Sequence, residues 1–210
     1  MSLTAVIALV LVVTVGVLLA IMLSQKPASK AQRLIHQHRY EEAASVAERE
    51  IDRAEALKLL GRFDDAIAAY RKSDDPAAKE GIALSLAHLG RDLDEATRLM
   101  EETIAAHPQI QEFQALALAY IHLRNGKRED ALRLFDDNLV LLQTRFHDDY
   151  TDPDPLLAET LYLFGELSVA AGDTEKASTL RWLAAKWAPK SVWDRGVPAP
   201  TSGPAGEIRP

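Results

Sequence analysis

The sequence predicts an all-α protein, in which a single N-terminal transmembrane helix precedes a short, irregular solenoid of α-hairpins. One observation is a six-residue turn that recurs between helix-like stretches. It reads Gly-Arg-Phe-Asp-Asp-Ala at 61–66, Gly-Lys-Arg-Glu-Asp-Ala at 126–131 and Gly-Asp-Thr-Glu-Lys-Ala at 172–177. The other is that apolar residues after Pro27 recur every three or four positions, without sustained strand-like alternation. Stacked hairpins form binding surfaces, so the turn favours a binding protein over an enzyme.

The first predicted element is a transmembrane helix at residues 3–23, an uncharged run dominated by Val, Leu, Ile and Ala. A helix of this length spans about 31 Å at roughly 1.5 Å per residue, which matches the hydrocarbon core of a bilayer. A cleavable secretory signal would need a basic start and a shorter apolar run, and Met1 and Ser2 supply no basic residue. We therefore expect a retained anchor.

Residues 24–39 form a basic juxtamembrane segment, with four Lys or Arg and no acidic residue. The following part of the chain carries 20 basic and 31 acidic residues, so its net charge is −11 against +4 beside the anchor. Basic residues that flank an anchor resist translocation. This predicts a single-pass protein of the bacterial inner membrane with its helical domain in the cytoplasm. The alternative topology places that domain on the extracytoplasmic side.

Residues 40–194 are predicted to form the helical-repeat domain. The last residue of each turn is a small residue, because the two helices of a hairpin cross closely there, and the Gly before it ends the first helix in a left-handed conformation. In the first turn His38 stands where Gly is usual. The anchoring alanines are Ala43, Ala66, Ala96, Ala131 and Ala177.

These units resemble the tetratricopeptide repeat. In one unit Leu118 and Ala119 precede Gly126, and Phe135 follows Ala131 on the same face. In the last unit the matching residues are Phe164, Gly165, Gly172, Ala177, Ala184 and the closing Pro189. The spacings between the anchoring alanines are 23, 30, 35 and 46, against about 34 for the family. The resemblance therefore implies a diverged array whose early units are truncated and whose last unit carries an insertion.

One continuous core is expected along the array, since no hairpin buries its apolar face alone. Its predicted members are Leu57, Leu60, Phe63, Leu86, Leu93, Met100, Leu116, Leu118, Leu132, Phe135, Leu161, Phe164 and Leu180. Trp182, Trp187 and Trp193 are predicted to cap the open C-terminal end. Residues 195–210 are rich in Pro and Gly and are predicted to be a disordered tail.

The family resemblance also implies a binding groove lined by the first helix of each hairpin. By register the groove residues are Glu80, Leu84, His88, Phe113, Leu116, Tyr120, Arg124, Glu159, Tyr162 and Glu166, preceded by Glu48, Ile51 and Glu55. This lining is mixed apolar and acidic. Family members that clamp a chaperone's C-terminal carboxylate use Lys, Arg and Asn there, so that ligand is not expected. A basic or amphipathic protein segment suits the groove better.

No cofactor, metal or nucleic acid is expected. The chain lacks Cys, and no nucleotide-binding loop, His-Glu-x-x-His motif or nucleophile elbow is present. The acidic insertion at 147–155 lacks the Gly and distal Glu of a calcium loop, so we expect a solvated loop in which Asp152 or Asp154 caps a helix near Pro155. An acidic domain of pI about 5.4 also argues against nucleic-acid binding.

The sequence thus predicts a non-catalytic, membrane-anchored adaptor or scaffold that binds protein partners through its helical-repeat groove. The alternative is an extracytoplasmic, chaperone-like or envelope-assembly protein of the same fold. A third hypothesis, a metal-dependent enzyme built on the acidic insertion, lacks the supporting motifs. The oligomeric state, the pathway and the partner's identity are left open.

Overall fold

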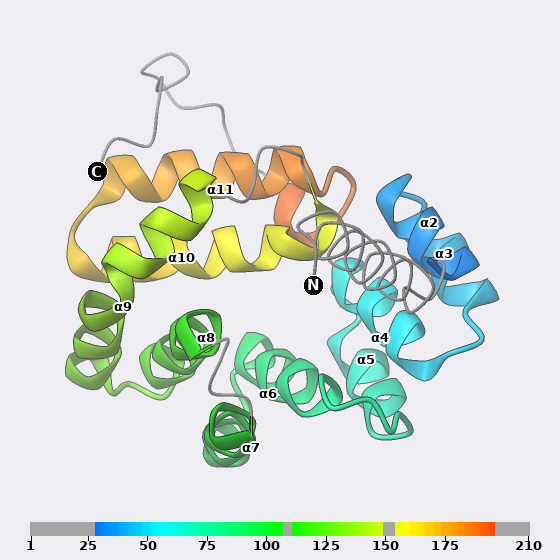
Figure 1. Ribbon diagram of the computed structural model, residues 1–210, viewed down its shortest axis with the longest axis horizontal. Coiled ribbons are helices and arrows are strands. Elements are labelled where there is room, and N and C mark those ends of the chain that lie inside the picture. The colour runs from blue at the N-terminus through cyan, green and yellow to red at the C-terminus, as the bar shows by residue number, and fades with distance from the viewer. Residues whose placement is uncertain (1–27, 107–110, 149–153, 196–210) are drawn as a thin grey trace, which may run out of the picture.

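The computed structural model describes residues 28–106, 111–148 and 154–195, and every regular element in these ranges is a helix (Figure 1). The helices are α2 (Lys30–His36), α3 (Tyr40–Val46), α4 (Glu50–Leu59), α5 (Phe63–Tyr70), α6 (Ala78–Leu89), α7 (Leu93–Ala106), α8 (Gln111–Arg124), α9 (Arg128–Asp148), η2 (Pro155–Leu157), α10 (Ala158–Ala171), α11 (Thr174–Trp187) and η3 (Val192–Asp194). The all-α prediction is therefore confirmed for this part of the chain.

The predicted transmembrane helix at 3–23 lies outside the described residues. So do residues 149–153 of the acidic insertion and all of the predicted tail except Arg195. Within the described ranges, none of the helices is both long enough and apolar enough to cross a membrane. Helix α2 lies in the segment predicted to be juxtamembrane, and it packs against α3 and α4. The helical array thus includes residues from Lys30 onward.

Consecutive helices pack as hairpins, and each hairpin packs on the next. The hairpin partners are α2 with α3, α4 with α5, α6 with α7, α8 with α9, and α10 with α11. The second helix of each hairpin then contacts the first helix of the following one, as in α3 with α4 and α5 with α6. Figure 1 shows the resulting arc, with α2 to α5 at one end and α8 and α9 at the other.

The recurring turns have the backbone that their sequence predicts. Gly61 adopts φ +75°, and Arg62 N–H donates to the Leu57 carbonyl at 2.9 Å, which ends α4. His38 takes the same left-handed conformation at φ +58° although it is not glycine. The turn at residues 90–96 is one residue longer than the others, and within it Asp92 adopts φ +48° before α7 begins.

The anchoring alanines are all buried, with exposed fractions of 0% to 1%, as the close helix crossings require. Most of the predicted core residues are buried too, among them Met100, Phe135 and Phe164. Leu60, Phe63 and Leu93 are only partly buried and pack against that core. The core is continuous along the hairpins because each unit covers the apolar face of its neighbour.

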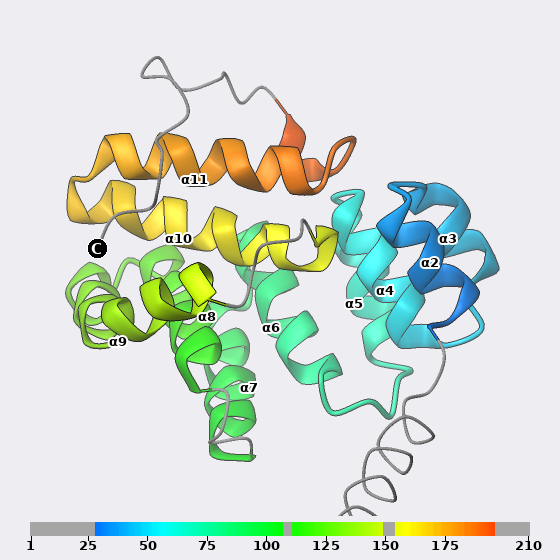
Figure 2. The ribbon, with the colours of Figure 1, turned by 45° about the horizontal axis from the view of Figure 1, so that its top comes forward.

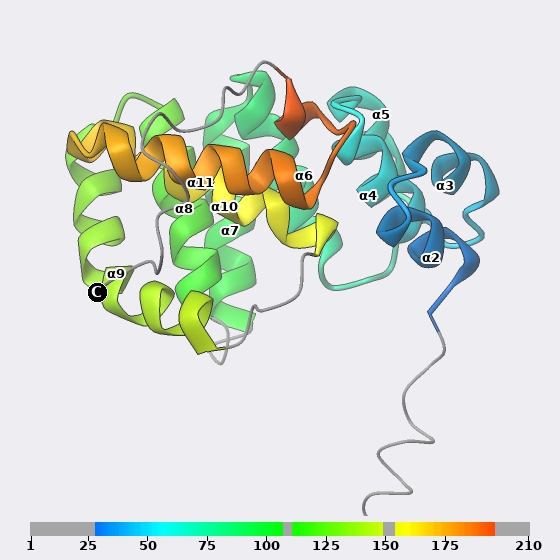
Figure 3. The same cartoon turned by 90° about the horizontal axis from the view of Figure 1, so that it is seen from above.

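The C-terminal hairpin closes the arc rather than extending it. Helix α10 packs on α8, and η3 contacts both α4 and α10. Figures 2 and 3 show the start of α10 beside α4 and α5, with η3 next to them. The first helices of the hairpins therefore surround a common interior.

Trp193 differs from the prediction that it caps an open end. Its side chain is buried inside the arc, and its rings lie 4.9 Å from His88, 4.9 Å from Tyr162 and 6.3 Å from Phe63, measured between ring centroids. The reason is that the arc curves far enough for the chain after α11 to return to α5 and α6. Trp182 and Trp187 remain half-buried on α11.

Replacing Gly81 by Ala is expected to destabilise the protein by about 1 to 3 kcal/mol. A Cβ atom at Gly81 would overlap the buried ring of Tyr70, with Cε1 and Cε2 only 2.5 and 2.6 Å away. Urea unfolding of the full-length protein in a mild detergent measures the loss. Gly165→Ala is the matched control and should cost less, because its closest neighbours, Arg181 Cγ at 3.1 Å and the Ala177 carbonyl oxygen at 3.3 Å, leave more room than the Tyr70 ring leaves at Gly81. Equal losses in both variants would contradict this packing.

Candidate functional site

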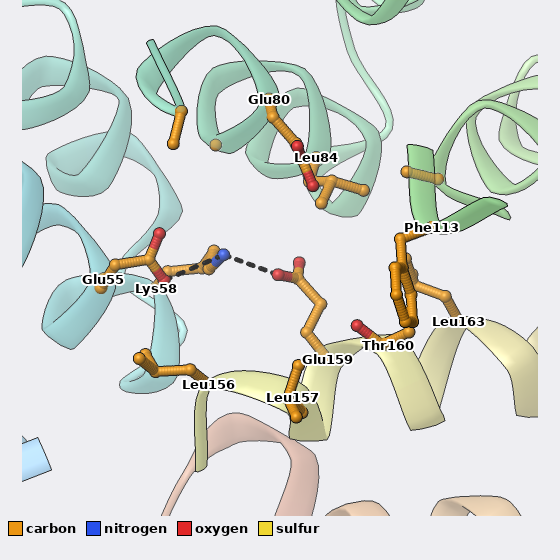
Figure 4. A pocket seen from close by; sticks show the side chains of 13 residues that line it. Glu55, Lys58, Glu80, Leu84, Phe113, Leu156, Leu157, Glu159, Thr160 and Leu163 are labelled. Carbon is orange, nitrogen blue, oxygen red and sulfur yellow. Dashed lines mark ion pairs between the residues drawn. The ribbon is translucent and has the colours of Figure 1, made fainter. Parts of the chain in front are cut away.

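A pocket of about 320 Å³ opens on the inner side of the arc, where α4, α6, α8 and α10 meet (Figure 4). Each helix contributes residues at three- or four-residue spacing, so one face of each helix is turned toward the pocket. The lining consists of Glu55, Lys58, Ala77, Glu80, Gly81, Leu84, Phe113, Ala117, Leu156, Leu157, Glu159, Thr160 and Leu163. The wall is largely apolar, and its charged groups are three carboxylates and one ammonium.

Lys58 joins two of these carboxylates and connects the early and late parts of the chain. Its Nζ lies 2.6 Å from Glu159 Oε2 on α10 and 3.1 Å from Glu55 Oε2 on its own helix (Figure 4). The Lys58 and Glu159 side chains are only 9% and 7% exposed. An ion pair this deep is shielded from water, so removing either partner leaves an uncompensated buried charge.

A chain of hydrogen bonds extends from this ion pair behind the pocket. His88 Nε2 lies 2.8 Å from Glu159 Oε1, and the carboxylate can only accept there, so this nitrogen carries the proton. His88 Nδ1 lies 3.2 Å from Tyr120 Oη, which in turn accepts from Arg124 Nη1 at 3.0 Å. In the other direction, Tyr70 Oη donates to Glu55 Oε1 at 2.5 Å.

We call Glu55, Lys58, Tyr70, His88, Tyr120, Arg124 and Glu159 the closure network. Its residues come from α4, α5, α6, α8 and α10, so the network links four of the hairpins. His88 and Tyr120 have the order of a catalytic relay with Glu159, but both are buried and neither lines the pocket. The network therefore holds the helices around the pocket.

Burial and neighbouring charges shift the pKa values of Lys58, Glu159 and Tyr70 in this network. Burial disfavours the Lys58 ammonium, but Glu159 and Glu55 outweigh that effect and raise the pKa of Lys58 well above its usual value. Burial likewise disfavours the Glu159 carboxylate, and the opposing effects of Lys58 and His88 lower the pKa of Glu159 to about 2. Burial and the neighbouring Glu55 carboxylate raise the pKa of Tyr70. Lys58 and Glu159 are both charged across the neutral range.

Glu80 faces the pocket without such a partner. Its carboxylate points toward Glu159 from α6 in Figure 4, and within the described part of the chain it forms no ion pair with Lys58 or any other basic group. Burial raises the pKa of Glu80. The charges of Glu159 and Glu55 add to this effect, and the charge of Lys58 and a hydrogen bond with Gln114 oppose it. The pocket therefore holds surplus negative charge on its α6 side.

The structure divides the predicted groove residues into two groups. Glu80, Leu84, Phe113 and Glu159 line the pocket, together with Glu55. The other predicted residues lie outside its lining: Ile51, His88, Leu116, Tyr120, Arg124, Tyr162 and Glu166, and also Glu48, which lines a separate pocket beside α2.

Packing and polar contacts occupy this second group. Leu116 and Tyr120 are 1% exposed and belong to the core. Tyr162 packs against Trp193, and Glu166 accepts hydrogen bonds from Arg181 at 2.6 and 2.9 Å. The described residues therefore form no continuous groove along the first helices, because Trp193 and the packed side chains of α8 and α10 occupy much of the interior.

Lys58 and Thr160 line the pocket but were missed by reasoning from the sequence. A signal for Lys58 was present in the sequence, because residues three apart on a helix share a face and Glu55 is a predicted groove residue. Its pairing with Glu159 depends on the curvature of the whole arc, which no local pattern gives. Thr160 follows Glu159 directly and faces the pocket because η2 and the start of α10 both contribute to it.

The end of the acidic insertion has the predicted capping role. Asp154 Oδ1 accepts the Leu156 backbone N–H at 2.9 Å, and Pro155 occupies the first turn of η2. His36 Nδ1 lies 3.7 Å from the same carboxylate. Within the described residues, no group of three or more His, Asp or Glu is arranged to hold a metal ion.

Comparison with models of known protein families yields no match, and comparison with curated proteins yields none either. The interpretation of the pocket therefore depends on its own residues.

Acid is expected to weaken the fold through Glu159. Its folded-state pKa is lowered to about 2, so its contribution to stability is complete above the ordinary value of 4.5 and is lost as the pH falls toward 2. Glu80 changes stability with pH in the opposite direction, because its folded-state pKa is raised. The measurement therefore uses a Glu80→Gln background. Urea unfolding at pH 7, 4 and 3 should show falling stability, and Glu159→Gln should reduce that slope. An unchanged slope would contradict the assignment.

Proposed function

We propose that this chain is a non-catalytic, membrane-anchored adaptor of the tetratricopeptide-repeat type, which holds a segment of a partner protein in the pocket between α4, α6, α8 and α10. The observation that carries the proposal is that Glu80, Leu84, Phe113 and Glu159, predicted as binding residues from the repeat register, line one pocket. They come from three different hairpins, so the binding surface depends on the complete arc.

The proposal includes a location at the bacterial inner membrane, with residues 3–23 as the anchor and the helical domain in the cytoplasm. The array begins at Lys30, only seven residues after the proposed anchor. Tethering at this distance confines the pocket to the membrane surface and raises its effective concentration toward membrane-bound partners. A reporter that is active only outside the cytoplasm, fused after Pro210, should be silent.

Site-specific photo-crosslinking in native membranes tests the adaptor function. A photoreactive amino acid at Thr160 faces the pocket, and the same residue at Glu175 on the exposed start of α11 is the control. We expect a discrete crosslinked protein from position 160 that is not formed from position 175. The same products from both positions, or none from position 160, would contradict pocket binding.

A further inference from the structure

We propose that the pocket takes one Lys or Arg side chain of the partner segment, with flanking apolar residues of that segment against the pocket wall. This inference deepens the adaptor function proposed above and rests on it. It commits to a cationic group carried by a peptide, and three features of the pocket argue for it: its uncompensated charge, its accessible carboxylates and its size.

The charge of the pocket calls for a cation. Three carboxylates face it against one ammonium, so it carries a charge of −2 when all four groups are ionised. Lys58 forms ion pairs with Glu55 and Glu159 and with no third carboxylate of the pocket. Glu80 is the carboxylate that no basic group of the described chain neutralises, and the nearby Glu159 and Glu55 make its ionised form costly. A ligand cation beside Glu80 removes that cost.

Two of the three pocket carboxylates are accessible to a ligand. Glu55 is 25% exposed and Glu80 is half-buried, whereas Lys58 and Glu159 are nearly inaccessible. Glu55 already holds Lys58 and Tyr70, so a cation can reach Glu80 without displacing Lys58. Binding in this position leaves the arc closed.

The size and walls of the pocket suit one side chain of a peptide. At about 320 Å³ it is at the lower end of the range for small-molecule sites. Leu84, Phe113 and Leu163 line it beside the carboxylates, so both the methylene chain of a Lys or Arg and an adjacent apolar side chain have a surface to cover. A strongly hydrated metal ion would leave these apolar walls unused.

The affinity of full-length protein in a mild detergent for dye-labelled peptides tests the inference. The probes are Leu-Lys-Leu and its uncharged analogue Leu-norleucine-Leu, blocked at their ends, and fluorescence anisotropy reports binding. We expect the Lys peptide to bind at least about tenfold more tightly than its analogue, because a charge-assisted hydrogen bond is worth that factor or more. Glu80→Gln should remove the difference, and Glu175→Gln, which removes the same charge outside the pocket, should preserve it.

The stability of Glu80→Gln separates a binding role from a purely structural one. If Glu80 binds the ligand, the unfolding midpoint of Glu80→Gln should equal or exceed that of the natural protein while peptide affinity falls, because Gln imitates the protonated form that burial favours. A loss of stability with unchanged affinity would overturn the inference. So would equal binding of both peptides, or no binding of either one. If crosslinking from Thr160 persists in any of these cases, only the cation assignment fails and the adaptor function stands.

Discussion

Replacing Lys58 by Met is expected to lower the free energy of unfolding by about 3 to 5 kcal/mol, because it leaves the buried Glu159 carboxylate and the half-buried Glu55 carboxylate without their shared counter-ion. Met is close to Lys in length and fills the same space, so loss of packing contributes little. Urea unfolding followed by circular dichroism measures the change in the full-length protein.

Arg39→Met is the matched control for this effect of charge. Arg39 forms an ion pair with Glu42 that is exposed on both sides, and such pairs contribute little to stability. Its unfolding midpoint should match that of the natural protein within experimental error. A Lys58→Met variant that behaves in the same way would show that the Lys58–Glu159 pair is not buried.

Replacing Trp193 by Ala is expected to cost about 3 to 5 kcal/mol, the usual range for truncating a buried Trp. Its side chain is 4% exposed and packs among Phe63, His88 and Tyr162. The cavity left behind lies where η3 meets α5 and α6, so these helices lose their contact with Trp193. Differential scanning calorimetry or urea unfolding measures the loss.

Trp187→Ala distinguishes this position from the other tryptophans of the C-terminal end. Trp187 is half-buried on α11 and should cost clearly less than Trp193. If Trp193→Ala were as mild as Trp187→Ala, Trp193 would be an end cap, as its sequence position predicts, and not a part of the interior.

The repeat register could be predicted from sequence because it depends on local chemistry. Each anchoring Ala follows a turn that ends one helix and starts another, and close crossing demands a small residue regardless of the rest of the molecule. Gly61 similarly needs a left-handed backbone for its own turn. These requirements act within a few residues, so they can be recognised in the local sequence.

The closure of the arc could not be predicted in this way. His88 and Glu159 are 71 residues apart in the chain, and the Arg195 guanidinium reaches the Leu60 carbonyl across 135 residues. Their contact depends on the accumulated curvature of several hairpins, and the uneven spacing of the repeats does not specify that curvature. The sequence therefore predicts an open end at Trp193 and gives no sign that Lys58 pairs with Glu159.

The arc's closure is also why the binding residues gather in one pocket. With α10 folded across the interior, Tyr120 and Tyr162 become internal packing residues, while Glu80 and Phe113 stay accessible at the pocket. A straight stack of the same hairpins would present all of them along one open groove.

A double-mutant cycle between Lys58 and Glu159 tests the closed arc most directly. The free energies of unfolding of Lys58→Met, Glu159→Gln and the double variant give the coupling between α4 and α10. The closed arc predicts a coupling of about 1.5 kcal/mol or more, with the double variant more stable than the sum of the single losses implies. A coupling within about 0.5 kcal/mol of zero would contradict it.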